Sequence, residues 1–344
     1  MTLTSGLGDR QIVLTAPTRL HFGLLNLSDA GYRIDGGCGL LLERPSVRVT
    51  ISSSKTLIVE PPCWFDVIAD CLGRVGLAEA DLCVNVDTKV PSHSGLGLGT
   101  QLRLATTVGA LTLLGRSIPG AALAPLVGRG GTSGVGSWGF WMGGFVVDAG
   151  HLRSAKISAL PTSMVNDPSL SPLILQQPFP WTTVVAIARD MDPVFGALEA
   201  SLFRSLTPTP RIDALRAYEV LLSQVIPSIS GGDLDGLDVA MRELREIGFK
   251  RREIAYRGHS AVRALGEFDD AGLLGGSMSS WGPAFFGFAP SAEAASRAEA
   301  ALRSSGVFSD VWASESSRSG ATVQLDGTFR SVATSRSMLA SREE

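Results

Sequence analysis

The sequence has few cysteines and no long apolar run, and each of these absences excludes a class of protein. Its four cysteines, Cys38, Cys63, Cys71 and Cys83, form no C-x-x-C pair and have no histidine ladder beside them, which argues against a zinc site. No stretch of 18 or more apolar residues occurs, and no charged start leads into an apolar core, so membrane spanning and secretion both lose support. The sequence therefore favours a cytoplasmic protein with free thiols.

The chain also lacks a surplus of charge of either sign, and this limits its partners. It carries 30 basic and 33 acidic side chains in 344 residues, and 44% of the residues are hydrophobic. A nucleic-acid-binding protein usually has a basic surplus, and a disordered chain has far less apolar material. We therefore expect a folded protein without a nucleic-acid partner and, because no long apolar run occurs, without a membrane partner. The length suggests two lobes, each with its own core.

Hydrophobic periodicity predicts an α+β protein. Strand-like runs lie at residues 11–16, 46–51, 57–60, 82–90, 145–147, 183–188, 284–288, 310–313 and 321–325. Helical patterns lie at residues 101–114, 121–127, 194–206, 212–226, 234–247, 253–265 and 292–304. The proline-rich stretch 161–180 is the expected crossing between lobes. The predicted domains are residues 1–165 and 166–334, with a frayed tail at 335–344.

Glycine is abundant, at 39 residues, and the strongest motif it forms is P-S-H-S-G-L-G-L-G-T-Q at residues 91–101. This loop joins an expected strand to an expected helix. Alternating glycines let the backbone approach a ligand, and the amides at a helix start carry partial positive charge, which favours phosphate binding. The spacing is neither that of a Walker loop nor that of a dinucleotide fingerprint, and a tight turn capped by a threonine is the alternative. The predicted phosphate-binding residues here are Gly95, Leu96, Gly97, Gly99, Thr100 and Gln101.

Two further glycine clusters follow. The first, at residues 128–136, combines five glycines with hydroxyls and an arginine, so we expect it to bind an anion as well. Its predicted phosphate-binding residues are Arg129, Gly130, Gly131, Thr132, Ser133 and Gly134. The second, at residues 275–283, precedes an apolar strand and is either a hairpin turn or a ligand-binding loop. In the latter case Ser279 and Ser280 contact the substrate.

Polar residues near the amino end complete the set of candidates. Arg19, His21, Arg33 and Asp35 are expected on loops joined by short connections. A lone histidine is usually a structural hydrogen-bonder, and a lone aspartate after a strand is usually a turn former, so the functional interpretation depends on their grouping with the glycine loops. We expect a structural role for His259. The role of His151 stays open, because it directly follows a glycine-rich strand.

Taken in order, these motifs resemble the three-part signature of the GHMP kinase superfamily and, more narrowly, the β-ribofuranosylaminobenzene 5′-phosphate synthase family. The segments that carry the resemblance are T-R-L-H-F-G-L at 18–24, R-I-D-G-G at 33–37, H-S-G-L-G-L-G-T-Q at 93–101, R-G-G-T-S-G-V-G at 129–136 and M-S-S-W-G-P at 278–283. The resemblance implies a two-lobed GHMP kinase-like fold and a homodimer. It also implies condensation of phosphoribosyl pyrophosphate with 4-aminobenzoate or 4-hydroxybenzoate, releasing carbon dioxide and pyrophosphate, as an early step of tetrahydromethanopterin biosynthesis.

The resemblance suggests a role for each catalytic candidate. Magnesium would neutralise pyrophosphate, and Asp35 would hold that ion or face the cationic ribose. Arg19 or Arg33 would bind the carboxylate of the aromatic acid, because a planar guanidinium matches a carboxylate. His21 or His93 would shuttle a proton. The apolar wall for the ring would come from Trp138, Phe140 or Trp141, although aromatic residues at such spacing are more often core.

Two other functions remain as alternatives. One is a small-molecule kinase of the same superfamily that uses ATP. The central loop of those kinases continues with serine hydroxyls that help to hold nucleotide phosphate and magnesium, whereas Leu98 and Gly99 stand there in this chain. Leucine offers no hydroxyl, which disfavours kinase chemistry. The other alternative is a ligand-binding relative that has lost catalysis.

Overall fold

The computed structural model describes residues 10–156, 158–165, 168–325 and 328–332, and it has the mixed α and β content that the periodicity predicts. The predicted frayed tail at 335–344 lies outside the described residues. The strands are β1 Gln11–Asn26, β2 Arg33–Ser53, β3 Ile58–Glu60, β4 Leu82–Thr88, β5 Phe145–Asp148, β6 His151–Leu152, β7 Leu173–Gln177, β8 Thr182–Ala188, β9 Leu274–Met278, β10 Ala284–Ala289, β11 Phe308–Ser314, β12 Thr322–Leu325 and β13 Thr328–Ser331.

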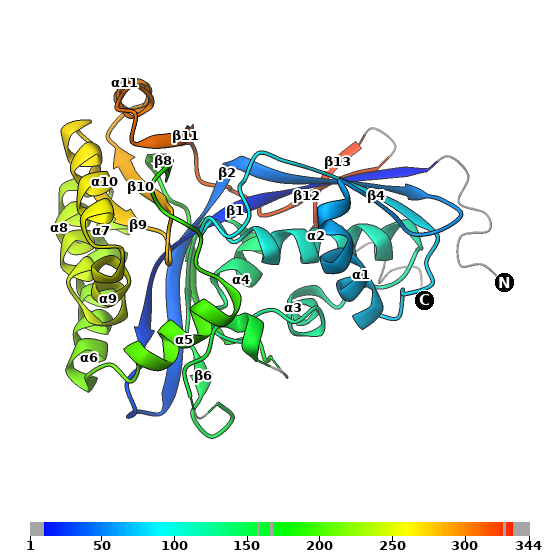
Figure 1. The fold of residues 1–344 in the computed structure, drawn as a ribbon, viewed down its shortest axis with the longest axis horizontal. Coiled ribbons are helices and arrows are strands. Elements are labelled where there is room, and N and C mark those ends of the chain that lie inside the picture. The colour runs from blue at the N-terminus through cyan, green and yellow to red at the C-terminus, as the bar shows by residue number, and fades with distance from the viewer. Residues whose placement is uncertain (1–9, 157, 166–167, 326–327, 333–344) are drawn as a thin grey trace.

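Helices gather at both ends of the molecule, and the long strands β1 and β2 run between them (Figure 1). The α-helices are α1 Phe65–Arg74, α2 Leu98–Leu113, α3 Leu123–Leu126, α4 Val135–Met142, α5 Gly196–Leu206, α6 Arg211–Val220, α7 Ile226–Gly231, α8 Leu234–Arg245, α9 Gly248–Arg257, α10 His259–Asp270 and α11 Ala292–Ser304. A π-helical segment at residues 221–225 joins α6 to α7. No helix in the described part of the chain is long and apolar enough to cross a membrane.

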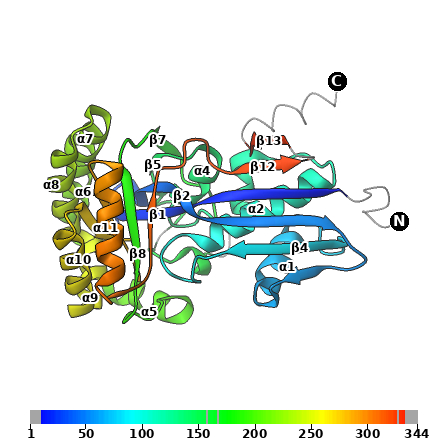
Figure 2. The same cartoon turned by 90° about the horizontal axis from the view of Figure 1, so that it is seen from above.

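A large sheet forms one half of the molecule, and β1 and β2 are its centre. Its strands run in the order β13-β12-β1-β2-β4-β3; β5 and β6 pair with the first part of β2, and β7 pairs with β5. Helix α2 packs against β1 and β2 and covers one face of this sheet (Figure 2). The strands β7, β12 and β13 follow the predicted domain boundary at residue 165, yet they pair in this sheet; the boundary itself stays a prediction.

The expectation that the four amino-terminal candidates lie on loops is wrong, because all four lie in paired strands. Arg33 pairs with Leu152 of β6, and the other three belong to the β1–β2 ladder. Arg19 pairs with Leu41 and His21 with Gly39, and Asp35 lies opposite Asn26. Register shifts after residues 17 and 21 absorb the irregularities of this segment, so a proline does not end the strand. The candidates are therefore held by a paired and rigid ladder.

A smaller four-stranded sheet in the order β11-β8-β10-β9 forms the other half. Both faces of β8 are covered, which explains its continuous apolar run. Val184 and Ala186 face a core that includes residues of α10 and α11, whereas Val185 and Ile187 face the main core, to which β1 and α8 contribute. The two halves thus share one continuous apolar interior along β1.

One helical prediction was wrong, and one helix was missed. The pattern at 253–265 is two helices, because Gly258 adopts φ +57 and ψ −132 and separates α9 from α10. The helix α4 was not predicted, because the glycine density of this region resembles a loop. Gly139 explains why it forms: a Cβ there would clash with Leu41, so the glycine lets α4 lie directly against β2.

Candidate active site

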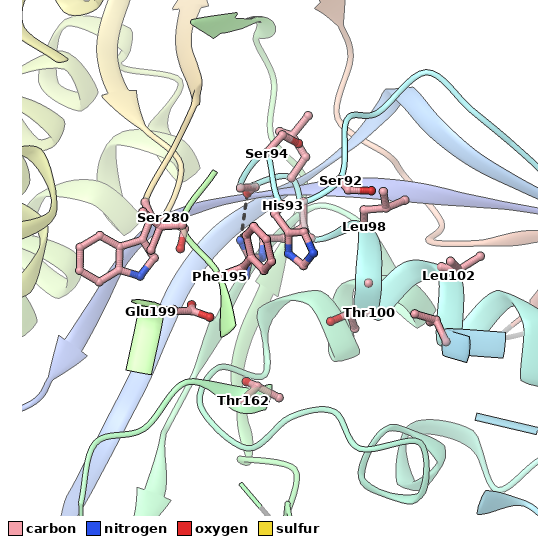
Figure 3. A pocket seen from close by; sticks show the side chains of 18 of the residues that line it. Ser92, His93, Ser94, Leu98, Thr100, Leu102, Thr162, Phe195, Glu199 and Ser280 are labelled. Carbon is pink, nitrogen blue, oxygen red and sulfur yellow. Dashed lines mark hydrogen bonds between the residues drawn. The ribbon is translucent and has the colours of Figure 1, made fainter. Parts of the chain in front are cut away.

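A cleft of about 370 Å³ opens where α2 begins, between the two halves of the molecule (Figure 3). It takes in all three glycine clusters, because the loop before α2, Arg129 and the turn between β9 and β10 all contribute to its wall. Its lining residues are Arg19, Trp64, Val67, Ser92, His93, Ser94, Gly95, Leu96, Gly97, Leu98, Gly99, Thr100, Leu102, Arg103, Arg129, Thr162, Val194, Phe195, Gly196, Glu199, Ser280, Trp281 and Gly282.

The loop before α2 is held in place by backbone contacts with the strands on either side. The amide of Arg19 donates to the carbonyl of Leu96 at 2.9 Å, and the amide of Ala284 donates to the carbonyl of Ser94 at 3.0 Å. A Cβ at Gly95 would clash with the carbonyl oxygen of Ser279, so only glycine permits this approach. The loop is therefore fixed before any ligand binds.

The first turn of α2 lines the cleft and contains two amides that the helix itself does not pair. Gly97 has φ +71 and ends the loop, and its carbonyl already accepts from the amides of Thr100 and Gln101. The amides of Leu98 and Gly99, in the first turn, have no carbonyl partner within the helix. The Gln101 side chain points away and donates to the carbonyl of Gly136, so its predicted phosphate contact is not supported. An anion at this end of α2 would also be stabilised by the helix dipole.

Two arginines without a carboxylate partner flank these amides. Arg19 makes one side-chain hydrogen bond, a 3.3 Å contact to the carbonyl of Gly95, and its Nε is buried without a partner. The guanidinium of Arg129 forms no hydrogen bond or ion pair with any described residue, and its Nε is also buried and unpartnered. Burial lowers the pKa of both guanidinium groups to about 10, so both stay charged at neutral pH. Two desolvated and unpaired cations make a strong site for an anion.

Replacing Gly99 with alanine is expected to weaken pyrophosphate binding about tenfold without loss of stability. A Cβ at Gly99 would clash with Nη2 of Arg129, and the guanidinium would move away from the helix start. Losing one charge-assisted hydrogen bond costs about 1.5–3 kcal/mol, whereas alanine is the better helix former. Calorimetric titration with pyrophosphate measures the affinity. Gly73→Ala in α1 is the matched control, because no atom lies within 4 Å of a Cβ there; equal affinity of the two variants would contradict this position for Arg129.

His93 is the predicted catalytic histidine that the structure places in the cleft. Its ring stacks on Phe195 with 4.1 Å between centroids, and its backbone has φ +57. Ser280, across the cleft, has φ +52. Non-glycine residues rarely adopt positive φ, and such strain concentrates at functional sites. Burial and then Arg129 lower the pKa of His93, so the ring is neutral at pH 7 and can donate or accept a proton.

The second glycine cluster contributes only Arg129 to the cleft; the rest of the loop binds groups of this protein. The anion in this loop is Asp148, whose carboxylate accepts from the amide of Gly134 at 2.9 Å and from Ser133 Oγ at 3.2 Å. Thr132 donates to the carbonyl of Leu160. The Thr132 hydroxyl, the Ser133 hydroxyl and the Gly134 amide thus already have partners, and the carbonyls of Gly130 and Gly131 accept from His151 and Lys156. None of these five residues is among the described residues that line the cleft, and their phosphate contacts stay a prediction.

Asp35 is buried outside the cleft in a cluster with two cations. Its Oδ2 accepts from Lys156 Nζ at 2.8 Å and from His151 Nδ1 at 2.9 Å, while Nε2 of His151 faces the carbonyls of Gly130 and Ser169. Both ring nitrogens thus face acceptors, which fits a protonated ring. Burial opposes that charge, but the hydrogen bond and charge of Asp35 raise the pKa of His151. His151, whose role the sequence left open, is a structural partner of Asp35.

These contacts do not fit Asp35 as a magnesium ligand. Two cations already share its Oδ2, and a third positive charge there would be repelled. Within the described part of the chain, no group of three or more His, Cys, Asp or Glu side chains is placed to hold a metal ion. Asp35 φ is +67, so this residue too is held in an unusual conformation. We interpret the cluster as a brace between β2 and the segment that carries Lys156.

Three other candidates also lie outside the cleft wall. His21 is buried, with Nε2 3.3 Å from Ser133 Oγ, and burial followed by the charge of Arg19 lowers its pKa well below the ordinary value. Ser279 accepts from the amide of His21 and donates to the carbonyl of Gly95, so it ties β1 to the loop before α2. Arg33 donates to the carbonyl of Gly150 at 2.7 Å. All three side chains therefore bind other groups of the protein outside the cleft wall.

The aromatic wall of the cleft differs from the predicted one. Phe140 and Trp141 are buried in the main core, and the indole of Trp138 donates to the carbonyl of Ser171 at 2.8 Å. None of the three is among the described residues that line the cleft. Trp64, Phe195 and Trp281 line it instead. The sequence offered no signal for Trp64 and Phe195, because they come from segments that fold against the loop only in three dimensions.

Comparison with known proteins identifies the family of this chain. A β-ribofuranosylphenol 5′-phosphate synthase of Archaeoglobus fulgidus is 34% identical over 278 residues, covering 79% of this chain and 86% of the relative. The protein of the same name from Methanothermobacter thermautotrophicus is 33% identical over 291 residues, covering 80% and 88%. The chain belongs to the β-ribofuranosylphenol 5′-phosphate synthase family. No protein-family model matches the chain.

Solved structures similar to this member of the synthase family confirm the GHMP kinase-like fold. A homoserine kinase from Cytophaga hutchinsonii has a TM-score of 0.63 at 18% identity, with 91% of this chain and 97% of that chain covered. The phosphomevalonate kinase of Streptococcus pneumoniae has a TM-score of 0.62 at 10% identity, with 88% and 99% covered. The α+β prediction and the predicted resemblance are thus confirmed. At such identities the likeness extends to the fold and not to the reaction.

Proposed function

We propose that the cleft binds phosphoribosyl pyrophosphate and that the protein transfers its ribosyl 5′-phosphate group to a 4-substituted benzoate, with loss of carbon dioxide and pyrophosphate. The observation that carries this proposal is the pair Arg19 and Arg129, two half-buried cations without a carboxylate partner among the described residues, which lie beside the first amides of α2. A pyrophosphate group supplies the charges that this pair lacks. The family membership supports the ribosyl transfer, because the relatives are named as synthases of a ribosylated phenol phosphate.

The proposed reaction forms one carbon–carbon bond and breaks two bonds. The bond from the anomeric carbon to pyrophosphate breaks, its electron pair leaves on the pyrophosphate oxygen, and the ribose gains oxocarbenium character. The two arginines and the amides of Leu98 and Gly99 stabilise that leaving charge. The ring carbon that bears the carboxylate attacks the anomeric carbon. Its carboxylate then departs as carbon dioxide, and the electrons of that bond restore the aromatic ring.

We propose 4-hydroxybenzoate as the acceptor, with 4-aminobenzoate as the alternative. A ribosylated phenol keeps an oxygen opposite the new bond, which is what 4-hydroxybenzoate would leave there. Magnesium accompanies the pyrophosphate group as part of the substrate in this proposal, because the described residues do not fit a resident ion. The homodimer, the cytoplasmic location and the place in tetrahydromethanopterin biosynthesis stay predictions.

Release of labelled carbon dioxide tests the proposed function directly. Purified protein is incubated with magnesium, phosphoribosyl pyrophosphate and 4-hydroxybenzoate labelled in its carboxyl carbon. We expect labelled carbon dioxide and pyrophosphate in equal amounts, and a ribosylated phenol phosphate as the organic product. A parallel reaction with labelled 4-aminobenzoate compares the acceptors. ATP with homoserine or phosphomevalonate serves as the kinase control; phosphate transfer there, without labelled carbon dioxide, would overturn the proposal.

A further inference from the structure

Glu199 stands out in a cleft built for anions. It is the one acidic side chain among the described residues that line the cleft, where Arg19, Arg103 and Arg129 are also present. It comes from α5, and Figure 3 shows its carboxylate directed into the cleft, across from Thr100. The carboxylate of Glu199 forms no hydrogen bond or ion pair with any described residue. A carboxylate that lines the cleft and has no partner among the described residues is free to interact with a bound ligand.

The charged groups around Glu199 come from four elements. Arg19 on β1 and Arg129 before α4 attract its negative charge, whereas Glu253 on α9 repels it. Glu253 itself pairs with Lys250 at 2.6 Å. Arg103 of α2 also lines the cleft but pairs with Asp70. Burial first, and Glu253 second, raise the pKa of Glu199 to about 7, with the two arginines opposing the shift.

We propose that Glu199 is a catalytic acid, which takes up a proton when a pyrophosphate group binds and donates that proton to the departing pyrophosphate. This inference rests on the proposed function. As the anomeric C–O bond breaks, its electron pair stays on the pyrophosphate oxygen, and the proton of the Glu199 carboxyl group moves to that oxygen. Glu199 is then a carboxylate, whose negative charge faces the oxocarbenium ion until the ring carbon attacks. No co-reactant is needed.

Ligand binding causes Glu199 to take up a proton from solvent. A bound pyrophosphate places negative charge beside Glu199 and at the same time neutralises Arg19 and Arg129, the two cations that oppose its protonation. Both changes raise its pKa further above neutral. A group that is about half ionised in the free protein then becomes protonated in the complex, so binding must take up protons near neutral pH.

Calorimetry in two buffers with different ionisation enthalpies measures this proton uptake without any need for turnover. Pyrophosphate is titrated into the wild-type protein and into Glu199→Gln near neutral pH. The difference in uptake between them isolates Glu199 from the titration of pyrophosphate itself, and we expect about half a proton. Glu219→Gln, at an exposed glutamate of α6, is the matched control and should behave as the wild type. Equal uptake by Glu199→Gln and the wild type would overturn the proposal.

Turnover supplies the second readout. Glu199→Gln should lower kcat about 100-fold, the size of an ordinary general-acid effect, and should remove the high-pH limb of the kcat profile. Glu199→Asp should keep the proton uptake and part of the rate, which separates the acid role from simple loss of folding. Unchanged kcat in Glu199→Gln would overturn the acid step. A wild type that releases no carbon dioxide would refute the proposed function and the acid step together, while the calorimetry would still decide the proton uptake.

Discussion

Replacing Arg129 with alanine is expected to reduce kcat/KM for phosphoribosyl pyrophosphate about 1,000-fold, equivalent to about 4 kcal/mol. The guanidinium of Arg129 forms no hydrogen bond or ion pair with any described residue, so removing it breaks no polar contact among them. Its charge acts on bound pyrophosphate and on the further negative charge that the leaving group gains. Initial rates of labelled carbon dioxide release measure the effect, and calorimetry with pyrophosphate gives the binding component.

Two further variants test whether the loss of activity in Arg129→Ala comes from the guanidinium of Arg129. Arg129→Lys keeps the charge but not the planar fork, so it should recover part of the binding and less of the rate. Arg263→Ala, at an exposed arginine of α10 outside the cleft, should leave both unchanged. The expected stability of Arg129→Ala is no lower than that of the wild type, because a desolvated and unpaired cation is removed. If Arg129→Ala kept the kcat/KM of the wild type, the leaving pyrophosphate would not bind beside Arg129.

The sequence predicted the main phosphate site because its signal is local. A strand, alternating glycines and a helix start occupy consecutive residues. The glycines themselves permit the backbone conformation that a phosphate-binding loop requires. The same holds for the hairpin turn before β10, which brings Ser280 to the cleft. Arg129 was predicted from the second glycine cluster and Arg19 from the polar group near the amino end, and both line the cleft, although the strand that carries Arg19 was predicted as a loop.

The sequence could not show which polar groups satisfy one another across the fold. The 129–134 loop does hold an anion, but that anion is Asp148, a partner 14 residues beyond Gly134. Glu199 lies in an ordinary amphipathic helix whose Ala200 and Phe203 face the interior, and nothing in that pattern separates it from a solvated glutamate. The raised pKa of Glu199 arises from its burial and from charged residues that are distant in the sequence and meet only in the folded protein.

The buried lysine beneath the β9–β10 turn is expected to control both stability and ligand binding. Lys250 is 2% exposed; it pairs with Glu253 at 2.6 Å and donates to the carbonyls of Met278 at 3.0 Å and Ser280 at 3.4 Å. Replacing it with methionine fills a similar volume but leaves Glu253 buried without its cation. The free energy of unfolding, measured in urea, should fall by about 3–5 kcal/mol. Lys55→Met, at an exposed lysine, should change it little.

A second substitution separates the two roles of Lys250. The double variant Lys250→Met/Glu253→Gln removes the unpaired charge, so most of the lost stability should return, since a buried ion pair contributes little net stability. The carbonyls of Met278 and Ser280 still lack their donor, and the turn that places Ser280 in the cleft stays unsupported. Pyrophosphate affinity should therefore remain low although stability recovers. If affinity returned together with stability, Lys250 would act only through the charge balance of α9 and would not position the turn.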